Sequence, residues 1–258
     1  MPLVTYQNIL KIILSYTAVT MTSSMISSSN ASKKTLLQQC IPFVKFRNLT
    51  SKGFNLIDSK IITYQHGELI SKWIDKLEIT DNIKNSYNFR LLFRGSRDGL
   101  SGDEFLKVCD NQSRTVTIVK VKDSSEILGG YNPIEWKSES IQGVTNDSFI
   151  FSFKSKNSIE DHILSRVIDR KCAISNDYFC GPSFDSDLTI WQFNFISDSD
   201  YEAYNYTSYC RKTSYEKPIR EIEGFFSVEE CEVFLVEPDP LAISLTLFFY
   251  SLLIYRVK

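Results

Sequence analysis

The sequence predicts an α+β fold whose centre is a two-layer antiparallel β-sandwich. Short β-rich runs follow one another from residue 89 to residue 236, separated by turns, as in known sandwiches. Two stretches, residues 66–77 and about 102–109, have the features of helices. The 258 residues are 43% hydrophobic and 13% aromatic, so the chain can bury a sizeable core, and disorder of the whole chain is excluded.

The N-terminal segment differs in charge from the rest of the chain. Residues 1–57 contain six Lys or Arg and no Asp or Glu, which leaves 23 basic and 31 acidic residues in the remainder. An acidic body without a basic, aromatic surface argues against nucleic acid as a partner. Residues 1–35 join the apolar run ILKIILSYTAV to a Ser/Thr-rich stretch, with Lys11 interrupting the run and no arginine present. We expect a disordered or targeting-like leader there.

Residues 66–77, HGELISKWIDKL, predict an amphipathic helix packed on the core. The apolar positions recur at intervals of three and four residues: Leu69, Ile70, Trp73, Ile74 and Leu77. His66 stands at the start of this helix, where we expect it to act as a capping or surface residue. It is not expected to be a metal ligand, because His162 is the only other histidine in the chain.

The stretch LLFRGSRDGLSGDEF, residues 91–105, has two opposed interpretations. A phosphate-binding loop would use glycine amides and arginine side chains to hold an anion. However, Gly95, Gly99 and Gly102 match neither the nucleotide-binding nor the dinucleotide-binding spacing, and no lysine follows them. A structural turn between a strand over 89–93 and a helix from about Gly102 to Cys109 is therefore the favoured interpretation.

The residues of this stretch also predict local contacts. Ser101 and Glu104 have the S-x-x-E spacing of a capping box, which begins a helix. Gly95 and Gly99 are expected to supply unusual backbone angles. The charged side chains expected to pair across the turn are Arg94, Arg97 and Asp98.

Further strands are predicted by short runs rich in β-branched and aromatic residues. They cover residues 115–122, 126–132, 148–154, 171–175, 187–193 and 231–236. Phe149, Phe151 and Phe153 alternate, so they share one face of their strand. Gly129 and Gly130 interrupt an apolar strand and predict a bulge or a close backbone approach, with a ligand contact as the functional alternative.

The C-terminal run LAISLTLFFYSLLIY, residues 241–255, has no charged residue and cannot stay exposed in a stable monomer. As a helix it would span roughly 22 Å, less than a hydrocarbon core of about 30 Å. We expect either attachment to a membrane by a short tail anchor, which is slightly favoured, or burial against the domain.

Cysteine and histidine usage does not predict a catalytic or metal site. The six cysteines form no C-x-x-C pair: Cys40, Cys109, Cys172, Cys180, Cys210 and Cys231. In a domain of this size, free, reduced and mostly buried cysteines of a cytoplasmic protein are expected. No nucleophile–base pair is evident, so we expect no catalytic residue, no cofactor and no metal, and the sequence leans against an enzyme.

Five blocks of the sequence, taken in order, resemble the TLDc domain family. They are RLLFRGSRDGLSGDEFLKVCDN, TVTIVKVKDSSEILGGYNPIEW, DSFIFSFK, CGPSF and FFSVEECEVF. The likeness covers about residues 58–236 and is greatest to fungal proteins that combine a BTB domain, a BACK-like linker and a TLDc domain. It implies a central β-sandwich flanked by helices. It also implies structural roles for the motif residues Arg94, Gly95, Ser96, Arg97, Asp98, Gly99, Gly129, Gly130, Gly181, Pro182 and Glu232.

The resemblance also implies a domain organisation and a function. Residues 36–57 resemble the end of the BACK region, residues 58–236 form the TLDc domain, and residues 237–258 are a hydrophobic tail foreign to the family. TLDc proteins are associated with resistance to oxidative stress, and several bind the vacuolar-type proton ATPase (V-ATPase). The resemblance therefore implies a non-enzymatic protein-binding module, with V-ATPase subunits as candidate partners.

Two departures from the family pattern keep other functions open. No BTB domain precedes the BACK-like segment, so a truncated adaptor relic is one alternative. The family continues GPxFG with further glycines, whereas this chain has the acidic GPSFDSDLTIW. A cysteine-based redox protein, reacting through Cys109 or Cys180, is the other alternative. It is weakened because Cys109 would sit at a helix C-terminus, where the helix dipole raises a thiol pKa.

Overall fold

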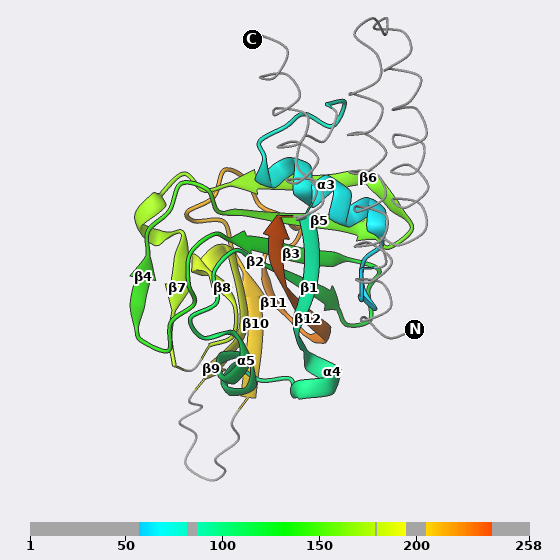
Figure 1. Cartoon of the computed structure of the whole chain (residues 1–258). Coiled ribbons are helices and arrows are strands. Elements are labelled where there is room, and N and C mark those ends of the chain that lie inside the picture. Colours follow the sequence, from blue (N-terminus) through cyan, green and yellow to red (C-terminus); the bar gives the residue numbers. More distant parts are fainter. Residues whose placement is uncertain (1–56, 82–86, 179, 195–204, 239–258) are drawn as a thin grey trace, which may run out of the picture. The chain divides into compact units, whose positions relative to one another are not determined.

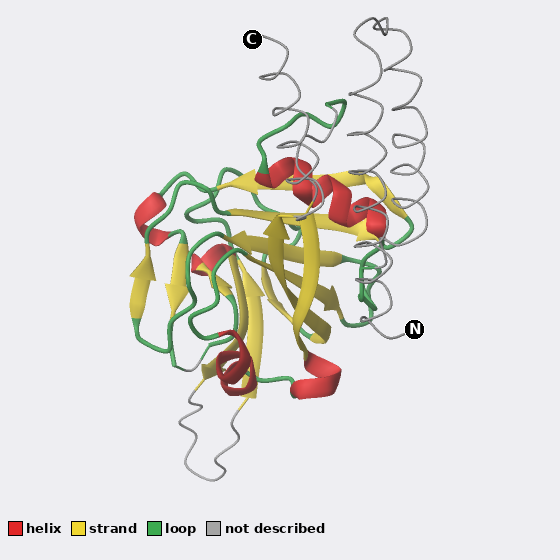
Figure 2. Ribbon diagram, in the orientation of Figure 1, coloured by secondary structure: helices red, strands yellow, loops and turns green. Residues whose placement is uncertain are grey.

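The computed structural model describes residues 57–81, 87–178, 180–194 and 205–238, all within the unit formed by residues 56–258. The predicted leader, residues 36–56 and the apolar run 241–255 lie outside the described residues. Antiparallel sheets dominate the described part and a few helices flank them, which confirms the predicted α+β β-sandwich (Figures 1 and 2). None of the helices described is long and apolar enough to cross a membrane.

The larger sheet has six antiparallel strands. In sheet order they are β1 (Tyr87–Arg94), β12 (Val228–Pro238), β2 (Thr115–Val121), β3 (Ile127–Asn132), β5 (Phe149–Ser155) and β6 (Ser158–Arg166). The last of the described strands therefore lies between the first two. Its Glu232 is in register with Arg94 of β1 on one side and with Ile118 of β2 on the other.

Two smaller sheets complete the described fold. The second sheet of the sandwich contains β11 (Gly224–Phe226), β10 (Asn205–Cys210), β9 (Leu188–Asn194) and β8 (Ser183–Phe184), in that order. A separate pair is formed by β4 (Ile141–Gly143) and β7 (Ile174–Asn176). Two short 3₁₀ turns, η1 (Arg170–Cys172) and η2 (Asp185–Asp187), precede β7 and β9.

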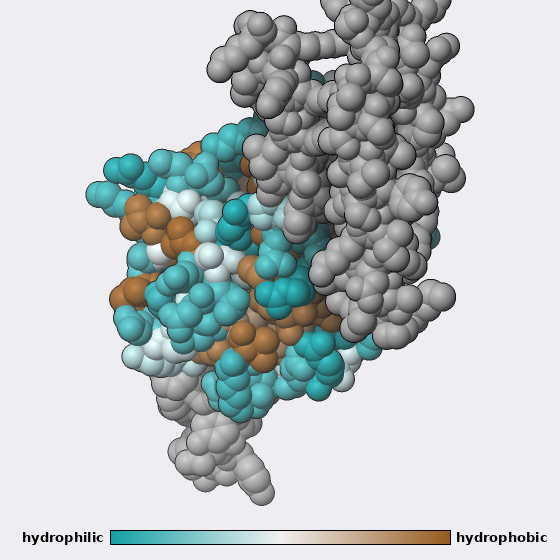
Figure 3. Space-filling model, in the orientation of Figure 1, coloured by the Kyte–Doolittle hydropathy of each residue, from teal (hydrophilic) through white to brown (hydrophobic). Residues whose placement is uncertain are grey.

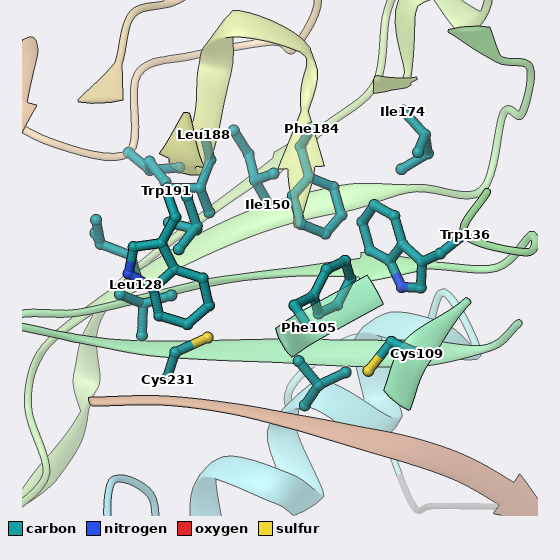
Figure 4. Close-up of a cluster of buried hydrophobic side chains, with 14 of the residues drawn as sticks. Phe105, Cys109, Leu128, Trp136, Ile150, Ile174, Phe184, Leu188, Trp191 and Cys231 are labelled. Carbon is teal, nitrogen blue, oxygen red and sulfur yellow. The ribbon is translucent and has the colours of Figure 1, made fainter. Parts of the chain in front are cut away.

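The six-stranded sheet separates two hydrophobic cores, because successive side chains of a strand point to opposite faces. Phe149, Phe151 and Phe153 share one face, as predicted, and pack in the core beneath α3 (Tyr64–Ile74). Ile150, between them, belongs to the core between the two sheets (Figure 4). The large sheet is thus buried on both faces, which explains why its central strands read as almost continuous apolar runs.

The predicted amphipathic helix is α3. Its apolar stripe includes Leu69, Ile70 and Trp73, all at most 3% exposed, and the Trp73 ring stacks on Phe153 with centroids 5.7 Å apart. The helix ends at Ile74, so the prediction that it extends to Leu77 was wrong; the chain turns at Lys76, whose φ is 55°.

His66 lies at the start of α3 and is 1% exposed, so the prediction that it could be a surface residue was wrong. Its capping role is confirmed, because Thr63 N donates to His66 Nδ1 at 3.3 Å and the Thr63 hydroxyl lies 2.8 Å from the same atom. Since Nδ1 accepts a hydrogen bond, the ring proton sits on Nε2. That atom has no hydrogen-bond partner among the described residues, and the ring meets Phe153 edge-on at 4.5 Å.

The helix predicted after the glycine-rich turn is α5 (Gly102–Cys109), within the predicted limits. Ser101 caps it by accepting a hydrogen bond from Glu104 N at 3.3 Å. The Glu104 carboxylate instead pairs with Lys107 at 2.6 Å, so only the serine half of the predicted capping box is formed. The turn itself forms a further short helix, α4 (Gly95–Asp98).

Two other predictions of secondary structure were incomplete. Residues 171–175 do not form one strand, because η1 occupies the first two positions and β7 begins at Ile174. The nine-residue strand β6 was not predicted, because Glu160 and Asp161 interrupt its apolar pattern at the solvent-facing edge of the sheet. Such charged residues are typical of edge strands.

Gly129 and Gly130 lie in a regular part of β3, with no register shift on either side, so the predicted bulge is absent. The predicted close approach is present. A Cβ at Gly130 would lie 2.5 Å from Cζ of Phe184, and one at Gly129 would lie 2.4 Å from Cζ of Phe151. Aromatic rings from a neighbouring strand and from the opposite sheet therefore fill the space that these side chains would need.

We predict that Gly130→Val lowers the free energy of unfolding by about 1–3 kcal/mol, because Phe184 is fully buried against Trp136 and cannot move aside. The measurement is the midpoint of chemical denaturation. Glu160→Val, at an exposed position of β6, is the matched control and should change stability by less than about 0.5 kcal/mol. Equal midpoints for Gly130→Val and the wild type would contradict the close approach.

We also predict a loss of stability at acidic pH that depends on His66. Burial, with the charge of Lys156 adding to it, lowers the pKa of His66 below its usual 6.5. The folded state then binds fewer protons than the unfolded state, so this contribution is present above about pH 6.5 and decreases as the pH falls. Protonation of Nδ1 would also remove the cap from Thr63 N. Thermal unfolding between pH 8 and pH 5 should show a smaller decrease for His66→Gln; parallel curves would oppose this assignment.

Candidate functional site

Glu232 is the centre of a polar network that includes the first described residues of the chain. Its side chain is completely buried, on β12. One carboxylate oxygen accepts hydrogen bonds from Lys60 N at 2.9 Å and Arg94 Nε at 2.8 Å, and the other accepts one from the Ser59 hydroxyl at 2.5 Å. A buried carboxylate is tolerated only when it is paired and hydrogen-bonded, and here both conditions are met.

Arg94 connects this carboxylate to the segment that leads into α3. Its Nη2 donates to the Asp58 carbonyl at 2.6 Å and to the Asp58 carboxylate at 2.9 Å. Burial opposes the charge on Arg94, but the hydrogen bonds to Asp58 and Glu232 outweigh it and raise the pKa of the guanidinium. Residues 58–60, β1 and β12 are therefore held at one point.

The RGSRDG turn is built around the same point. Ser96 N donates to Glu230 Oε1 at 2.9 Å, and the Ser96 hydroxyl accepts from Lys60 Nζ at 2.8 Å. Asp98 accepts from Arg94 N at 2.9 Å and pairs with Arg97 at 2.7 Å, and the bond from Arg97 lowers the Asp98 pKa. Arg94 and Arg97 therefore both pair with carboxylates, which leaves no arginine of this turn free to hold a phosphate.

One backbone prediction for this turn was wrong. Gly99 has φ 112°, an angle that favours glycine, but Gly95 is helical and has no positive φ. Gly95 is required for a different reason, since a Cβ there would lie 2.2 Å from the Leu100 side chain and 3.1 Å from Glu230 Oε1. The turn thus combines one unusual backbone angle with one close contact.

Gly181 and Pro182 lie where α5 meets the second sheet. Gly181 N donates to the Ile190 carbonyl at 2.8 Å, and Ile190 N donates to the Pro182 carbonyl at 3.1 Å. A Cβ at Gly102, the first residue of α5, would lie 2.7 Å from the backbone of Cys180. The structure therefore brings the turn, Glu232 and the 180–182 segment to the end of the domain that carries α4 and α5 (Figure 1).

Gly129 and Gly130 are not part of this group. They lie inside β3, and the rings of Phe151 and Phe184 fill the space above and below them. A ligand therefore has no room at these glycines, and the alternative interpretation as a ligand contact was wrong.

Residues 185–187 of the acidic loop form a second network that sequence reasoning missed. The Asp187 carboxylate is 2% exposed and accepts from three successive backbone amides: Thr213, Ser214 and Tyr215 at 3.0, 2.7 and 3.2 Å. Asp185 accepts from the Ser214 hydroxyl at 2.5 Å. These acids fix the loop between β10 and β11, and no spacing in the sequence distinguishes them from acids exposed to solvent.

The cysteines in the described residues form no disulfide with one another. Cys109 and Cys231 are completely buried in the core between the sheets, and burial raises the pKa of both thiols (Figure 4). A reactive cysteine needs an accessible thiolate, so neither position suits reaction with peroxide. No group of three or more His, Cys, Asp or Glu suited to a metal occurs in the part of the chain that the structure describes.

A cleft of about 430 Å³ opens beside the RGSRDG turn, next to the loop between α4 and α5. Its lining comes from the loop between α4 and α5, the β10–β11 hairpin, the bulged part of β9 and the ends of β2 and β12: Leu100, Lys122, Trp191, Ser208, Phe225, Phe226, Ser227 and Val228. Figure 3 shows apolar surface near the α4 and α5 end, interrupted by polar groups. The cleft combines apolar side chains with the polar residues Lys122, Ser208 and Ser227, a mixture that suits binding rather than bond-making chemistry.

A comparison with protein-family models matches residues 56–237 to the TLDc domain. The match spans more than two thirds of the chain and includes every strand of both main sheets, apart from the final residue of β12. A search of curated proteins finds no match.

We predict that Glu232→Ala destabilises the domain by about 3–5 kcal/mol, because it leaves Arg94 half-paired at a buried position. Glu229→Ala is the matched control on the same strand. Glu229 is 57% exposed and pairs with Lys120 at 3.7 Å, so its loss should cost less than about 1 kcal/mol. Chemical denaturation of both variants tests the difference; similar small effects would show that Glu232 does not hold the network together.

Proposed function

This chain belongs to the TLDc domain family, and from that premise we propose that it is a non-enzymatic protein-binding module that supports resistance to oxidative stress by docking on the V-ATPase. The observation that carries the proposal is the family match over both sheets of the sandwich. The same five sequence blocks supply the turn, the buried Glu232 and the glycine contacts that build one end of the domain.

The chemistry of the described residues supports a binding role over a catalytic one. The charged motif residues Arg94, Arg97, Asp98 and Glu232 hold one another and the main chain. The two thiols of the central core are inaccessible. In contrast, Phe225 lines the cleft and is 76% exposed, a property typical of protein contact surfaces.

The likeness of residues 40–54 to the end of a BACK region supports a further part of the proposal, a relationship to fungal BTB–BACK–TLDc proteins. The BTB-type adaptor remains the alternative function. A longer transcript that encodes an upstream BTB domain would favour that alternative.

The proposal is tested by capture of V-ATPase peripheral subunits with the purified full-length chain. We expect enrichment of these subunits over a control with Val119→Asp, which places a charge in the core between the sheets. Phe225→Ser, which leaves the core intact, should reduce capture if the exposed aromatic surface takes part. Equal recovery with the wild type and Val119→Asp would overturn the V-ATPase part of the proposal.

A further inference from the structure

One of the residues that line the cleft is a strained tryptophan. Trp191 has φ 54°, in the left-handed region that large side chains avoid. It lies at an irregularity of β9, where the register with β10 shifts between Thr207 and Tyr209, and Trp191 N donates to the Ser208 hydroxyl at 3.1 Å. Bulges and strained residues occur preferentially where a side chain is directed into a site.

The indole N–H of Trp191 has no hydrogen-bond partner in the described residues. The residue is 5% exposed, and its ring makes a T-shaped contact with Phe93, with centroids 5.9 Å apart. The buried unpaired polar atoms among the described residues are His66 Nε2, Thr117 Oγ1 and Asn132 Nδ2, so the indole nitrogen still reaches the surface. In Figure 4 it lies on the side of the ring away from Phe105 and Phe184.

Lys122 supplies a second donor to the same cleft. Its main-chain N–H bonds the Ser227 carbonyl at 2.9 Å, which fixes the residue at the rim, while its ammonium has no partner in the described part of the chain. The neighbouring Lys120, by contrast, pairs with Glu229. The free polar groups offered by Lys122 and Trp191 are therefore both hydrogen-bond donors, one of them charged.

Apolar side chains surround these two donors. Leu100 is 44% exposed and Phe225 is 76% exposed, while Phe226 and Val228 are half-buried. A cation and an unpaired N–H that line the same cleft suit a carboxylate, and the apolar side chains suit a hydrophobic side chain next to it. The body of the chain is acidic, so its net charge does not attract a carboxylate from a distance. The attraction would come from the short-range contacts with Lys122 and Trp191.

We propose that this cleft binds an extended acidic segment of a partner protein, with a carboxylate on Lys122 and the Trp191 N–H and an adjacent hydrophobic side chain on Leu100 and Phe225. This inference rests on the proposed protein-binding function and deepens it by defining the chemistry of the partner. The partner segment needs one Asp or Glu next to an aromatic or large aliphatic residue.

The indole resonances of the ¹⁵N-labelled full-length chain provide a direct test. The chain has three tryptophans, and Trp136 Nε1 already donates to the Thr115 hydroxyl at 2.8 Å inside the core. The probe is 3-phenylpropionate, which joins an aromatic ring to a carboxylate, and Trp191→Phe assigns the Trp191 resonance. We expect 3-phenylpropionate to shift the Trp191 indole signal and to leave that of Trp136 unchanged.

Matched probes and variants sharpen this test. Phenethylamine, butyrate and inorganic phosphate should each bind at least roughly tenfold more weakly than 3-phenylpropionate, since each lacks the carboxylate or the ring. Lys122→Glu should reverse the preference between 3-phenylpropionate and phenethylamine, while Lys154→Glu, at an exposed position on β5, should keep it. An unshifted Trp191 signal, an equal response to phosphate, or an unchanged preference in Lys122→Glu would each overturn the inference.

The failure of this inference is distinguishable from the failure of the proposed function. If the wild type captures V-ATPase subunits but 3-phenylpropionate does not bind, the docking surface lies elsewhere and only the inference fails. If 3-phenylpropionate binds as expected but no subunit is captured, the cleft is supported and the proposed partner is wrong.

Discussion

The buried carboxylate of Glu232 is the interaction on which the described fold depends. It has no contact with solvent, and its hydrogen bonds reach Ser59, Lys60 and Arg94, the most distant of them 173 residues away in the sequence. Because an unpaired charge in this position is costly, the three donors must be in place together. The carboxylate therefore fixes the segment before α3, and with it the helix that covers one face of the six-stranded sheet.

The second constraint is close packing at positions where a side chain would not fit. Gly102 faces the backbone of Cys180, and Gly130 faces the Phe184 ring. These contacts bring α5 and β8 nearer to the rest of the domain than a pair of ordinary residues would allow. Together with Glu232, they explain why residues far apart in the sequence build one end of the domain.

Local signals in the sequence were sufficient to predict α5 and most of the strands of the larger sheet. Ser101 and the alternation of Phe149, Phe151 and Phe153 act over a few residues, so their meaning can be read without the fold. The unpredicted features depend on long-range contacts. Whether Asp187 is buried depends on three amides more than 25 residues away, and Gly95 is constrained by the side chains of Leu100 and Glu230 rather than by its own backbone angles.

The candidate site also contains residues that local sequence patterns reveal and residues that only the fold reveals. The sequence pointed to the RGSRDG turn, whose charged side chains hold the fold together, whereas Trp191 and Lys122 carry no local pattern that distinguishes them. Their unpaired donors become apparent only when β9, the β10–β11 hairpin and the end of β2 are placed together. The residues that resemble a motif are thus mainly structural, and the free binding groups lie beside them.

The position of β12 has a consequence for how this protein is made. Of the strands that the structure describes it is the last to be synthesised, yet it lies between β1 and β2 and carries Glu232. Until residues 228–238 have been made, β1 lacks its neighbour in the described sheet, and Arg94 lacks Glu232. The sandwich therefore cannot close progressively from its N-terminus; it must wait until residues 228–238 emerge, and the exposed edges of β1 and β2 need protection from other chains during that interval.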